Sequence, residues 1–227
     1  MRPIALRLNH APAASGSAYL ELGATKVAAA VYGPRENTRA AGESVAQQGV
    51  LEVHAQFAPF ASRRLRGLAP SAVMEEERRL AGALRAALLP AVLLERFPRC
   101  VVEVHLLVLE ADGGELAAGA AAASAALLHA GVDIADVVAA AQVGLRGGGG
   151  EGATSIVLDP CAAEEAACAG RATVAFMPAL KRVTHAVHSG AVGEAPLLEA
   201  LRAALGACEA VAGAMRPALL AAAKSRA

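Results

Sequence analysis

Three arginines within four positions form the densest positive cluster in the sequence. Arg63, Arg64 and Arg66 directly follow the stretch Phe57 to Phe60. A guanidinium group carries a permanent charge and presents a planar fork of donors that matches phosphate oxygens. The cluster therefore indicates either a loop that grips an RNA backbone or a solvated basic turn, and the sequence leaves both open.

A glycine-rich run from Gly147 to Thr154 suggests phosphate binding but lacks the residues that would perform it. A P-loop uses a lysine to reach the phosphates, and this run contains none. No helical pattern follows the run closely and it lies outside any βαβ unit, so a dinucleotide-binding fingerprint is absent as well. We expect a flexible loop here.

Hydrolytic and metal chemistry have little support in the sequence. No Gly-x-Ser-x-Gly elbow is present, which disfavours a serine hydrolase. His185 and His188 are three residues apart in an expected strand, so their side chains should point to opposite faces and not share a metal. The cysteines form no C-x-x-C pair and are expected to be buried thiols, so we expect neither a metal nor a cofactor; they are Cys100, Cys161, Cys168 and Cys208.

The first half of the chain should supply a hairpin, a third strand and a long helix. Ser17 to Gly23 and Thr25 to Gly33 are short β-type runs separated by a turn, and Val50 to Phe60 is a further strand after a polar loop from Arg35 to Gln48. Apolar residues then recur at helical spacing from Met74, behind three glutamates that suit a helix start. We expect Pro90 to kink this helix and Phe97-Pro98 to end it.

The second half predicts a buried helix between strands and a long final helix. Val101 to Glu110 is an apolar run typical of a strand, and Asp112-Gly113-Gly114 should turn it into an alanine-rich helix that ends near His129. Further strands are expected at Val137 to Leu145, Ser155 to Leu158 and Thr173 to Met177, and a helix from Glu194 to about Ala223. This order predicts one α+β domain over residues 1–227 with a mixed sheet, and not a doubly wound fold.

Composition limits the possible partners. Hydrophobic residues make up 56% of the 227 residues and charged residues 19%, which excludes a disordered chain. Aromatic residues are only 3%, so an RNA-binding sheet of stacked aromatics is disfavoured. Lys plus Arg and Asp plus Glu each total 21, so any RNA contact must be local. A neutral, apolar chain also suits a subunit that hides surface in a permanent complex.

The start of the sequence and its longest uncharged stretch bear on where the protein acts. The segment after Met1 lacks the apolar run of a signal peptide. The uncharged stretch from Leu116 to Val132 is too short for a membrane span and contains Ser124 and His129. We expect an intracellular, soluble protein.

The run from Gly16 to Val27, followed by Tyr32-Gly33-Pro34-Arg35, resembles the first hairpin of ribonuclease PH-like subunits of the RNA exosome. Further matching motifs follow in the same order, and the resemblance covers the chain from about Ser15 to the final helix. The family's Arg-x-Asp-Gly-Arg motif, which precedes the hairpin, is not found here. The further motifs are Phe57 to Arg66, Glu76 to Arg99, Asp112-Gly113-Gly114, His129 to Val132 and Leu158-Asp159-Pro160.

This resemblance implies an RNase PH-like fold, also described as similar to domain 2 of ribosomal protein S5. It implies a place in a hexameric ring with paralogous subunits, beneath S1-domain cap subunits, guiding single-stranded RNA during 3′–5′ processing and degradation, including rRNA processing. The expected location is nucleus, nucleolus and cytoplasm. The stretches Ala58 to Ala61 and Leu158 to Pro178 look most like the eukaryotic mRNA transport regulator three type of subunit, which is regarded as non-catalytic.

Two departures from the active members of the family affect the phosphate site. In active relatives a Thr-Arg pair follows Asp-Gly-Gly, whereas Glu115 and Leu116 stand there in this chain. Replacing a hydroxyl and an arginine by a carboxylate and an alkyl group removes the cradle that an attacking phosphate needs.

The second departure concerns a carboxylate near the leaving 3′ oxygen. Active relatives have an acidic pair and, shortly after it, an aspartate that assists this oxygen or holds a metal. Glu164 and Glu165 match the pair, but the later positions are Ala169, Gly170 and Arg171. The resemblance therefore implies a non-catalytic ring subunit; the alternative is an active phosphate-dependent 3′–5′ exoribonuclease that works with a paralogous partner.

Overall fold

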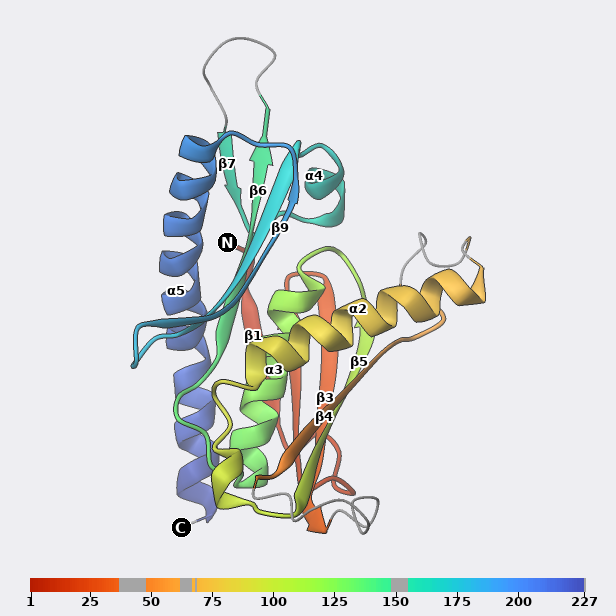
Figure 1. Cartoon of the computed structure of the whole chain (residues 1–227), viewed down its shortest axis with the longest axis vertical. Coiled ribbons are helices and arrows are strands. Elements are labelled where there is room, and N and C mark those ends of the chain that lie inside the picture. The colour runs from red at the N-terminus through yellow and green to blue at the C-terminus, as the bar shows by residue number, and fades with distance from the viewer. Residues whose placement is uncertain (37–47, 62–66, 68, 148–154, 227) are drawn as a thin grey trace.

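The computed structural model describes residues 1–36, 48–61, 67, 69–147 and 155–226. Arg63, Arg64 and Arg66, most of the expected loop at residues 35–48 and most of the glycine-rich run lie outside the described residues. Within the described parts, two sheets lie one above the other along the long axis of Figure 1, and helices pack against both. The expected α+β architecture is confirmed.

The lower sheet has five strands in the order β1-β2-β3-β5-β4. The β2–β3 pair is the predicted hairpin, with Leu22 opposite Thr25 at its turn, and β4 runs parallel to β5 while the other pairs are antiparallel. The sheet is therefore mixed, as expected. Its strands are β1 (Ile4–Leu8), β2 (Gly16–Leu22), β3 (Thr25–Glu36), β4 (Val50–Phe57) and β5 (Cys100–Glu110).

Helices α2 (Pro70–Leu88) and α3 (Glu115–Ala130) cover one face of this sheet (Figure 1). Alternate residues of β3 point toward them, so that Val27 and Val31 are fully buried. The alanine-rich composition of α3 lets it approach the strands closely, because small side chains keep the backbones near each other. A Cβ atom added at Gly16 would overlap the backbone nitrogen of Ala130, which shows how tight this contact is.

Helix α2 differs from its prediction at both ends. It begins at Pro70, whose missing N–H costs nothing in a first helical turn, so the three glutamates lie farther along the helix and its first turn holds no acid. It ends at Leu88, so Pro90 does not kink it, because a proline inside the helix would remove a hydrogen bond and clash with the carbonyl four residues back. The chain continues as turns into a short 3₁₀ helix, η2 (Leu94–Arg96).

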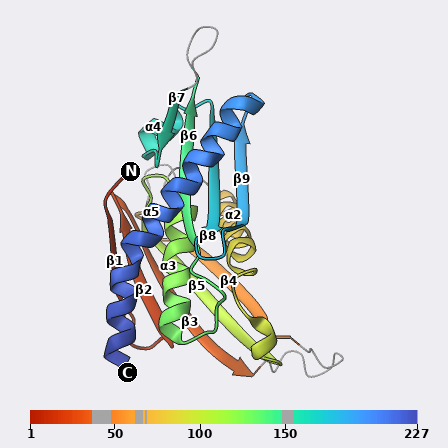
Figure 2. The same ribbon diagram turned by 90° about the vertical axis from the view of Figure 1, so that its left-hand side faces the viewer.

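The upper sheet has four antiparallel strands in the order β7-β6-β8-β9. The long final helix, α5 (Glu194–Arg226), packs along β6 and β8 in its first part and reaches β1 near its end (Figure 2). The strands are β6 (Ala139–Arg146), β7 (Ser155–Leu158), β8 (Gly170–Met177) and β9 (Arg182–Gly190), and a short helix α4 (Ala162–Ala166) follows β7.

One hydrophobic cluster joins the two sheets. It contains residues of the lower sheet, of α2 and α3, and of β6, β8 and α5, including Leu84, Leu127 and Met215. Helix α3, which is buried from Ala117 to Leu127, therefore serves as the central packing element between them. Among the described residues, no helix has both the length and the apolar character that a membrane crossing requires.

Candidate functional site

A cavity of about 410 Å³ opens where α2, α4 and the start of α3 meet the upper sheet. Both Glu115 and Leu116 line it, together with Glu165 of α4 and Arg171 of β8. The two departures from active relatives concern residues that are far apart in the sequence. In the structure these residues line the same cavity. The proximity of these two groups of residues was implied only by the resemblance.

Glycines place the start of α3 at the wall of this cavity. Gly113 and Gly114 have φ angles of +83° and +72°, a left-handed conformation that side-chain-bearing residues rarely adopt. A Cβ at Gly113 would lie 2.9 Å from the carbonyl oxygen of Pro160, so the turn also needs glycine for space. Glu115 follows in the first helical turn, where the free N–H groups carry partial positive charge that favours an anion.

The Glu165 carboxylate is paired with the Arg171 guanidinium, and both line the cavity. The side chain of Glu165 is 16% exposed and that of Arg171 44%, so the acid is the more deeply buried partner. On the neighbouring α2, the Arg79 guanidinium lies 3.3 Å from the Glu76 carboxylate. Arg79 and Arg171, the two arginines that line the cavity among the described residues, are therefore each paired with a carboxylate of the chain itself.

The preceding glutamate has a different role. Glu164 caps α4, with its carboxylate accepting a hydrogen bond of 3.0 Å from the backbone N–H of Cys161. This bond lowers the pKa of Glu164 below its usual range, because it stabilises the charged form. Of the acidic pair that the sequence singled out, Glu165 lines the cavity and Glu164 builds the helix next to it.

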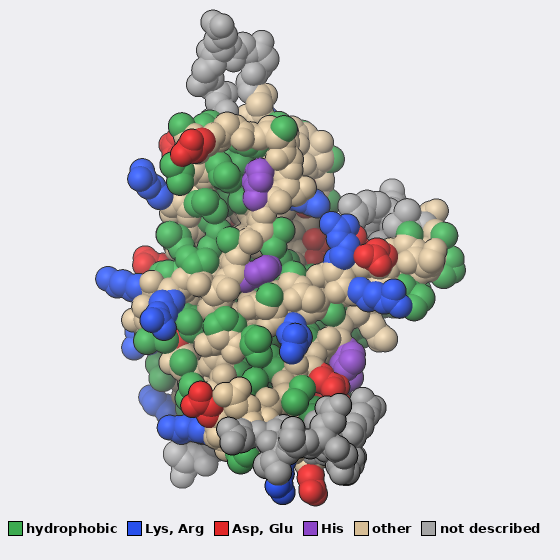
Figure 3. Space-filling view, in the orientation of Figure 1, with side chains coloured by type: hydrophobic (Ala, Val, Ile, Leu, Met, Phe, Trp, Pro, Cys, Tyr) green, Lys and Arg blue, Asp and Glu red, His purple; other side chains and the backbone are tan. Residues whose placement is uncertain are grey.

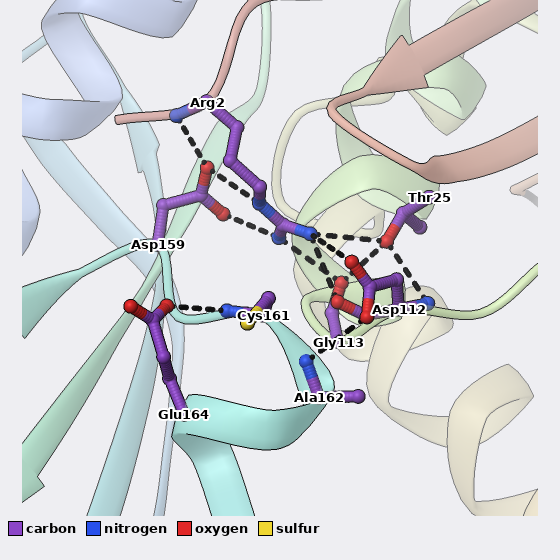
Figure 4. A network of polar contacts seen from close by, with 8 residues as sticks. All are labelled: Arg2, Thr25, Asp112, Gly113, Asp159, Cys161, Ala162 and Glu164. Atoms are coloured by element: carbon purple, nitrogen blue, oxygen red, sulfur yellow. Dashed lines mark hydrogen bonds and ion pairs between the residues drawn. The ribbon is translucent and has the colours of Figure 1, made fainter.

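A polar network behind the cavity fixes the turn before α3 (Figure 4). Arg2 donates to the backbone carbonyl of Asp112 at 2.9 Å and to that of Gly113 at 3.1 Å, and it also binds the Asp159 carboxylate. The Thr25 hydroxyl donates to the Gly113 carbonyl at 2.7 Å. Burial acts to lower the pKa of Arg2, but the hydrogen bond and charge of Asp159 outweigh it and raise that pKa.

This network was missed by reasoning from the sequence, although a signal was present. Asp159 stands in a motif of the family resemblance, and the start of the chain was considered only as a possible signal peptide. From Ile4 to Leu8 the large apolar residues alternate with Ala5 and Arg7, which is typical of a strand, and such a strand at the edge of the hairpin brings the start of the chain near Thr25.

One polar group in the cavity wall lacks a partner. Gln142 is 5% exposed and lines the cavity, and its side-chain Nε2 makes no hydrogen bond with any residue that the structure describes. A buried donor without an acceptor costs free energy. The Gln142 Nε2 group is therefore an unsatisfied hydrogen-bond donor in the cavity wall. Gln142 adds this donor to the cavity wall without adding charge, because an amide side chain is neutral.

The arginine cluster lies outside the described residues, and Ala61 is the last described residue before it. Ala61 accepts a hydrogen bond of 2.9 Å from the backbone N–H of Ala111, and Ala111 lines the cavity. The chain therefore leaves the described region at Ala61 close to the cavity. On the face shown in Figure 3, Lys and Arg side chains are scattered among acidic and apolar ones.

The histidines and cysteines do not form a site in the described parts of the chain. His185 and His188 lie on β9, and no group of three or more potential ligands comes together among the described residues. The expectation that all cysteines are buried is wrong, since only Cys208 is fully buried while Cys100, Cys161 and Cys168 lie partly exposed. Their places near strand starts and helix ends, and not in the core, explain the difference.

Comparison with known proteins agrees with this geometry. A family model described as "3′ exoribonuclease family, domain 1" matches residues 1–133. The chain is 40% identical, over 237 aligned positions, to exosome complex component MTR3 of Homo sapiens, which covers 100% of this chain and 85% of that protein. It is 37% identical, over 219 positions, to exosome complex component Rrp41 of Pyrobaculum neutrophilum, covering 96% of this chain and 85% of that protein.

A solved structure extends the match to the whole fold. The crystal structure of rice (Oryza sativa) Rrp46 superposes with a TM-score of 0.82 at 26% identity, over 97% of this chain and 95% of that one. The expected RNase PH-like fold is thereby confirmed. The family model and these relatives show that the chain belongs to the 3′ exoribonuclease family of ribonuclease PH-like proteins.

Proposed function

We propose that this chain is a ring subunit of an RNA exosome and that it does not itself catalyse phosphorolysis. Its identity of 40% with an exosome component of the MTR3 type supports the first part. The ion pair between Glu165 and Arg171, inside the cavity that Glu115 also lines, carries the second part. In this proposal, the chain's own charges stand where a phosphate and a reacting 3′ end bind in an active relative.

Electrostatics give the size of this effect. A carboxylate such as Glu115 about 5 Å from a phosphate opposes it by roughly 1–3 kcal/mol per phosphate charge at effective dielectric constants of 80 to 20. An arginine lost at position 116 removes roughly another 1.5–3 kcal/mol of charge-assisted hydrogen bonding. Together these terms lower phosphate affinity by a factor of about 70 to about 20,000.

The same proposal covers the organisation and location of the chain. Residues 1–227 form one RNase PH-like domain, which is supported by a hydrophobic cluster that contains residues of both sheets. The chain assembles with paralogous ring subunits beneath S1-domain caps and passes single-stranded RNA through the ring. It acts in the nucleus, nucleolus and cytoplasm, as expected for an exosome subunit of the eukaryotic type.

The competing function is phosphate-dependent 3′–5′ exoribonuclease activity with a paralogous partner. The identity of 37% with an archaeal exosome component Rrp41 is the observation that favours it. In that case Arg171 would have to release Glu165 when the partner binds.

The test is an assay of the purified chain, alone and co-purified with its paralogous partners, on single-stranded RNA with magnesium and inorganic phosphate. We expect no nucleoside diphosphates from the chain alone, and no activity of the complex that depends on Glu165. Phosphate-dependent release of nucleoside diphosphates that is lost on Glu165→Gln, but kept on Glu164→Gln, would establish the competing function.

A further inference from the structure

A second cavity, of about 670 Å³, lies away from the site described above. It is bounded by the end of β1, the end of α3, the turn between β8 and β9, and the later turns of α5. Its lining is mostly apolar, and Leu220 stands at it with 52% of its surface exposed. We refer to this cavity as the α5 groove. No step of the proposed function uses it.

One wall of the α5 groove is fixed by a single carboxylate. Asp136 accepts hydrogen bonds of 2.7 Å from the backbone N–H of Ala179 and of 3.3 Å from that of Leu180, which ties the β8–β9 turn to the segment before β6. The same carboxylate accepts a bond of 2.7 Å from the N–H of Val137. Because this wall is held by several bonds, the groove is preformed and does not depend on a loose turn.

The opposite wall is a face of α5 that runs from Glu209 to Ala223. At 1.5 Å per residue this face is about 21 Å long. Gly213 lies in its middle, and a Cβ atom added there would meet nothing within 4 Å. The absence of a side chain at this point opens the groove and lets another backbone come near the helix.

Two charged side chains of opposite sign mark the groove along its length. Glu209 and Arg216 both line it, both are exposed, and neither forms an ion pair with any residue that the structure describes. They are seven residues apart on one helix, which places them on the same face about 10 Å apart. An occupant that satisfies both must therefore carry a basic and an acidic group at about that spacing.

We propose that the α5 groove binds an amphipathic helix of a partner protein. Its length, its apolar floor and the missing side chain at Gly213 suit a helix, since small residues allow two helix axes to approach to about 8–10 Å. The partner helix presents apolar residues at helical spacing to the groove, a basic residue to Glu209 and an acidic residue two turns away to Arg216. A compact small molecule would leave one of the two charges without a partner.

The experiment places a photo-crosslinking amino acid at position 213 of the full-length chain, in its native cells, and sequences the crosslinked peptide. The matched control carries the same amino acid at Gly206, seven residues earlier in α5, which also has open space around it but does not line the groove. We expect position 213, and not position 206, to crosslink one segment of another protein with the amphipathic and charge pattern described above.

A peptide of the crosslinked segment then serves as the probe with the purified chain. Gly213→Leu fills the groove and should weaken binding by about tenfold or more, while Gly206→Leu should leave it unchanged. The double charge reversal Glu209→Lys with Arg216→Glu should weaken binding roughly two- to fivefold, and a peptide with its two charges exchanged should restore it.

Three outcomes would overturn the proposal. Equal crosslinking at positions 213 and 206 would show that the groove has no specific occupant. A crosslink to a second copy of this chain, to a lipid or small molecule, or to a segment without helical apolar spacing would identify a different occupant. Unchanged peptide binding by the Gly213→Leu variant would show that the segment lies elsewhere on α5.

Discussion

The Arg2 guanidinium donates to both carboxylate oxygens of Asp159, at 3.0 Å and 2.6 Å, across a sequence separation of 157 residues (Figure 4). Asp159 follows β7 of the upper sheet, and Arg2 precedes β1 of the lower sheet. The side chains are only 5% and 15% exposed. This pair therefore fastens the two sheets together beside the candidate site.

Loss of either partner of this pair should destabilise the fold. Arg2→Met leaves the Asp159 carboxylate buried without its counter-charge, which costs about 3 kcal/mol, and Asp159→Asn has a similar effect on the guanidinium. The double variant should be less destabilised than the sum of the two single changes. Urea denaturation followed by circular dichroism measures this, and strict additivity of the two costs would argue against a direct pair.

Tight packing of α3 on β2 should make Gly16 sensitive to the smallest substitution. Gly16→Ala forces the new Cβ into the backbone of Ala130 and should lower the free energy of unfolding by about 2–3 kcal/mol. The matched control is Gly82→Ala in α2, where a Cβ meets nothing within 4 Å and alanine should stabilise by about 0.5–1 kcal/mol. Denaturation midpoints that move in the same direction for both variants would contradict the packing described for α3.

The buried thiol of Cys208 should be inert at neutral pH. Burial raises its pKa to about 12, so the folded protein keeps the thiol protonated while the unfolded chain ionises near the ordinary value of about 8.5. The folded-state pKa is the higher one, so this contribution to stability is complete below pH 8.5 and is lost as the pH rises toward 12.

Alkylation with iodoacetamide followed by peptide mass spectrometry checks this. Cys100 and Cys161, which are partly exposed, should be modified in the native protein, whereas Cys208 should react only in denaturant. Cys168 should react more slowly than these two, because burial raises its pKa as well. Modification of Cys208 in the native protein at pH 7, at the rate of Cys161, would show that α5 opens away from the upper sheet.

Restoring the phosphate cradle alone should not restore catalysis. The double variant Glu115→Thr with Leu116→Arg removes the opposing carboxylate and supplies a basic side chain, and should increase binding of inorganic phosphate by about tenfold or more. It should still release no nucleoside diphosphates, because Glu165 is paired with Arg171 and no aspartate stands at the positions shortly after the acidic pair. Phosphorolysis by this variant would show that the cradle was the only defect.

Local patterns in the sequence predicted most of the elements, because the spacing of their apolar residues matches the side-chain period of a strand or a helix, or, in α3, because nearly the whole helix is apolar. The hairpin of β2 and β3 and the helix α3 follow directly from alternating and alanine-rich patterns. The end of α2 was not predicted, because Pro90 allows either a kink or a stop and the choice depends on how the chain must turn to reach β5. The short edge strand β1 was missed because its burial depends on a partner strand and on α5.

The candidate site was predictable in part, and only through the family resemblance. The motif marked Glu115, Leu116 and Glu165 as residues of one site, and the structure places them around one cavity. The pairing of Glu165 with Arg171 was not foreseen, since it depends on the fold that brings α4 against β8. Gln142 gave no signal, because a single amide within an apolar strand has no distinctive spacing.

The arginine cluster supplies the last prediction, although Arg63, Arg64 and Arg66 lie outside the described residues. The chain leaves the described region at Ala61, which is bonded to Ala111 at the cavity, and returns at α2. We propose that these arginines face the central channel of the assembled ring and contact RNA phosphates without reading bases, because guanidinium forks suit phosphates.

Replacing all three with Ala should leave assembly intact, weaken RNA entry about equally for different sequences, and reduce the log–log salt dependence of binding by about 0.7 per lost phosphate contact. Filter binding of the assembled complex at several salt concentrations, together with sizing of the complex, measures both effects; a salt slope equal to that of the parent complex would mean that the cluster is a solvated turn and that the chain acts as a scaffold.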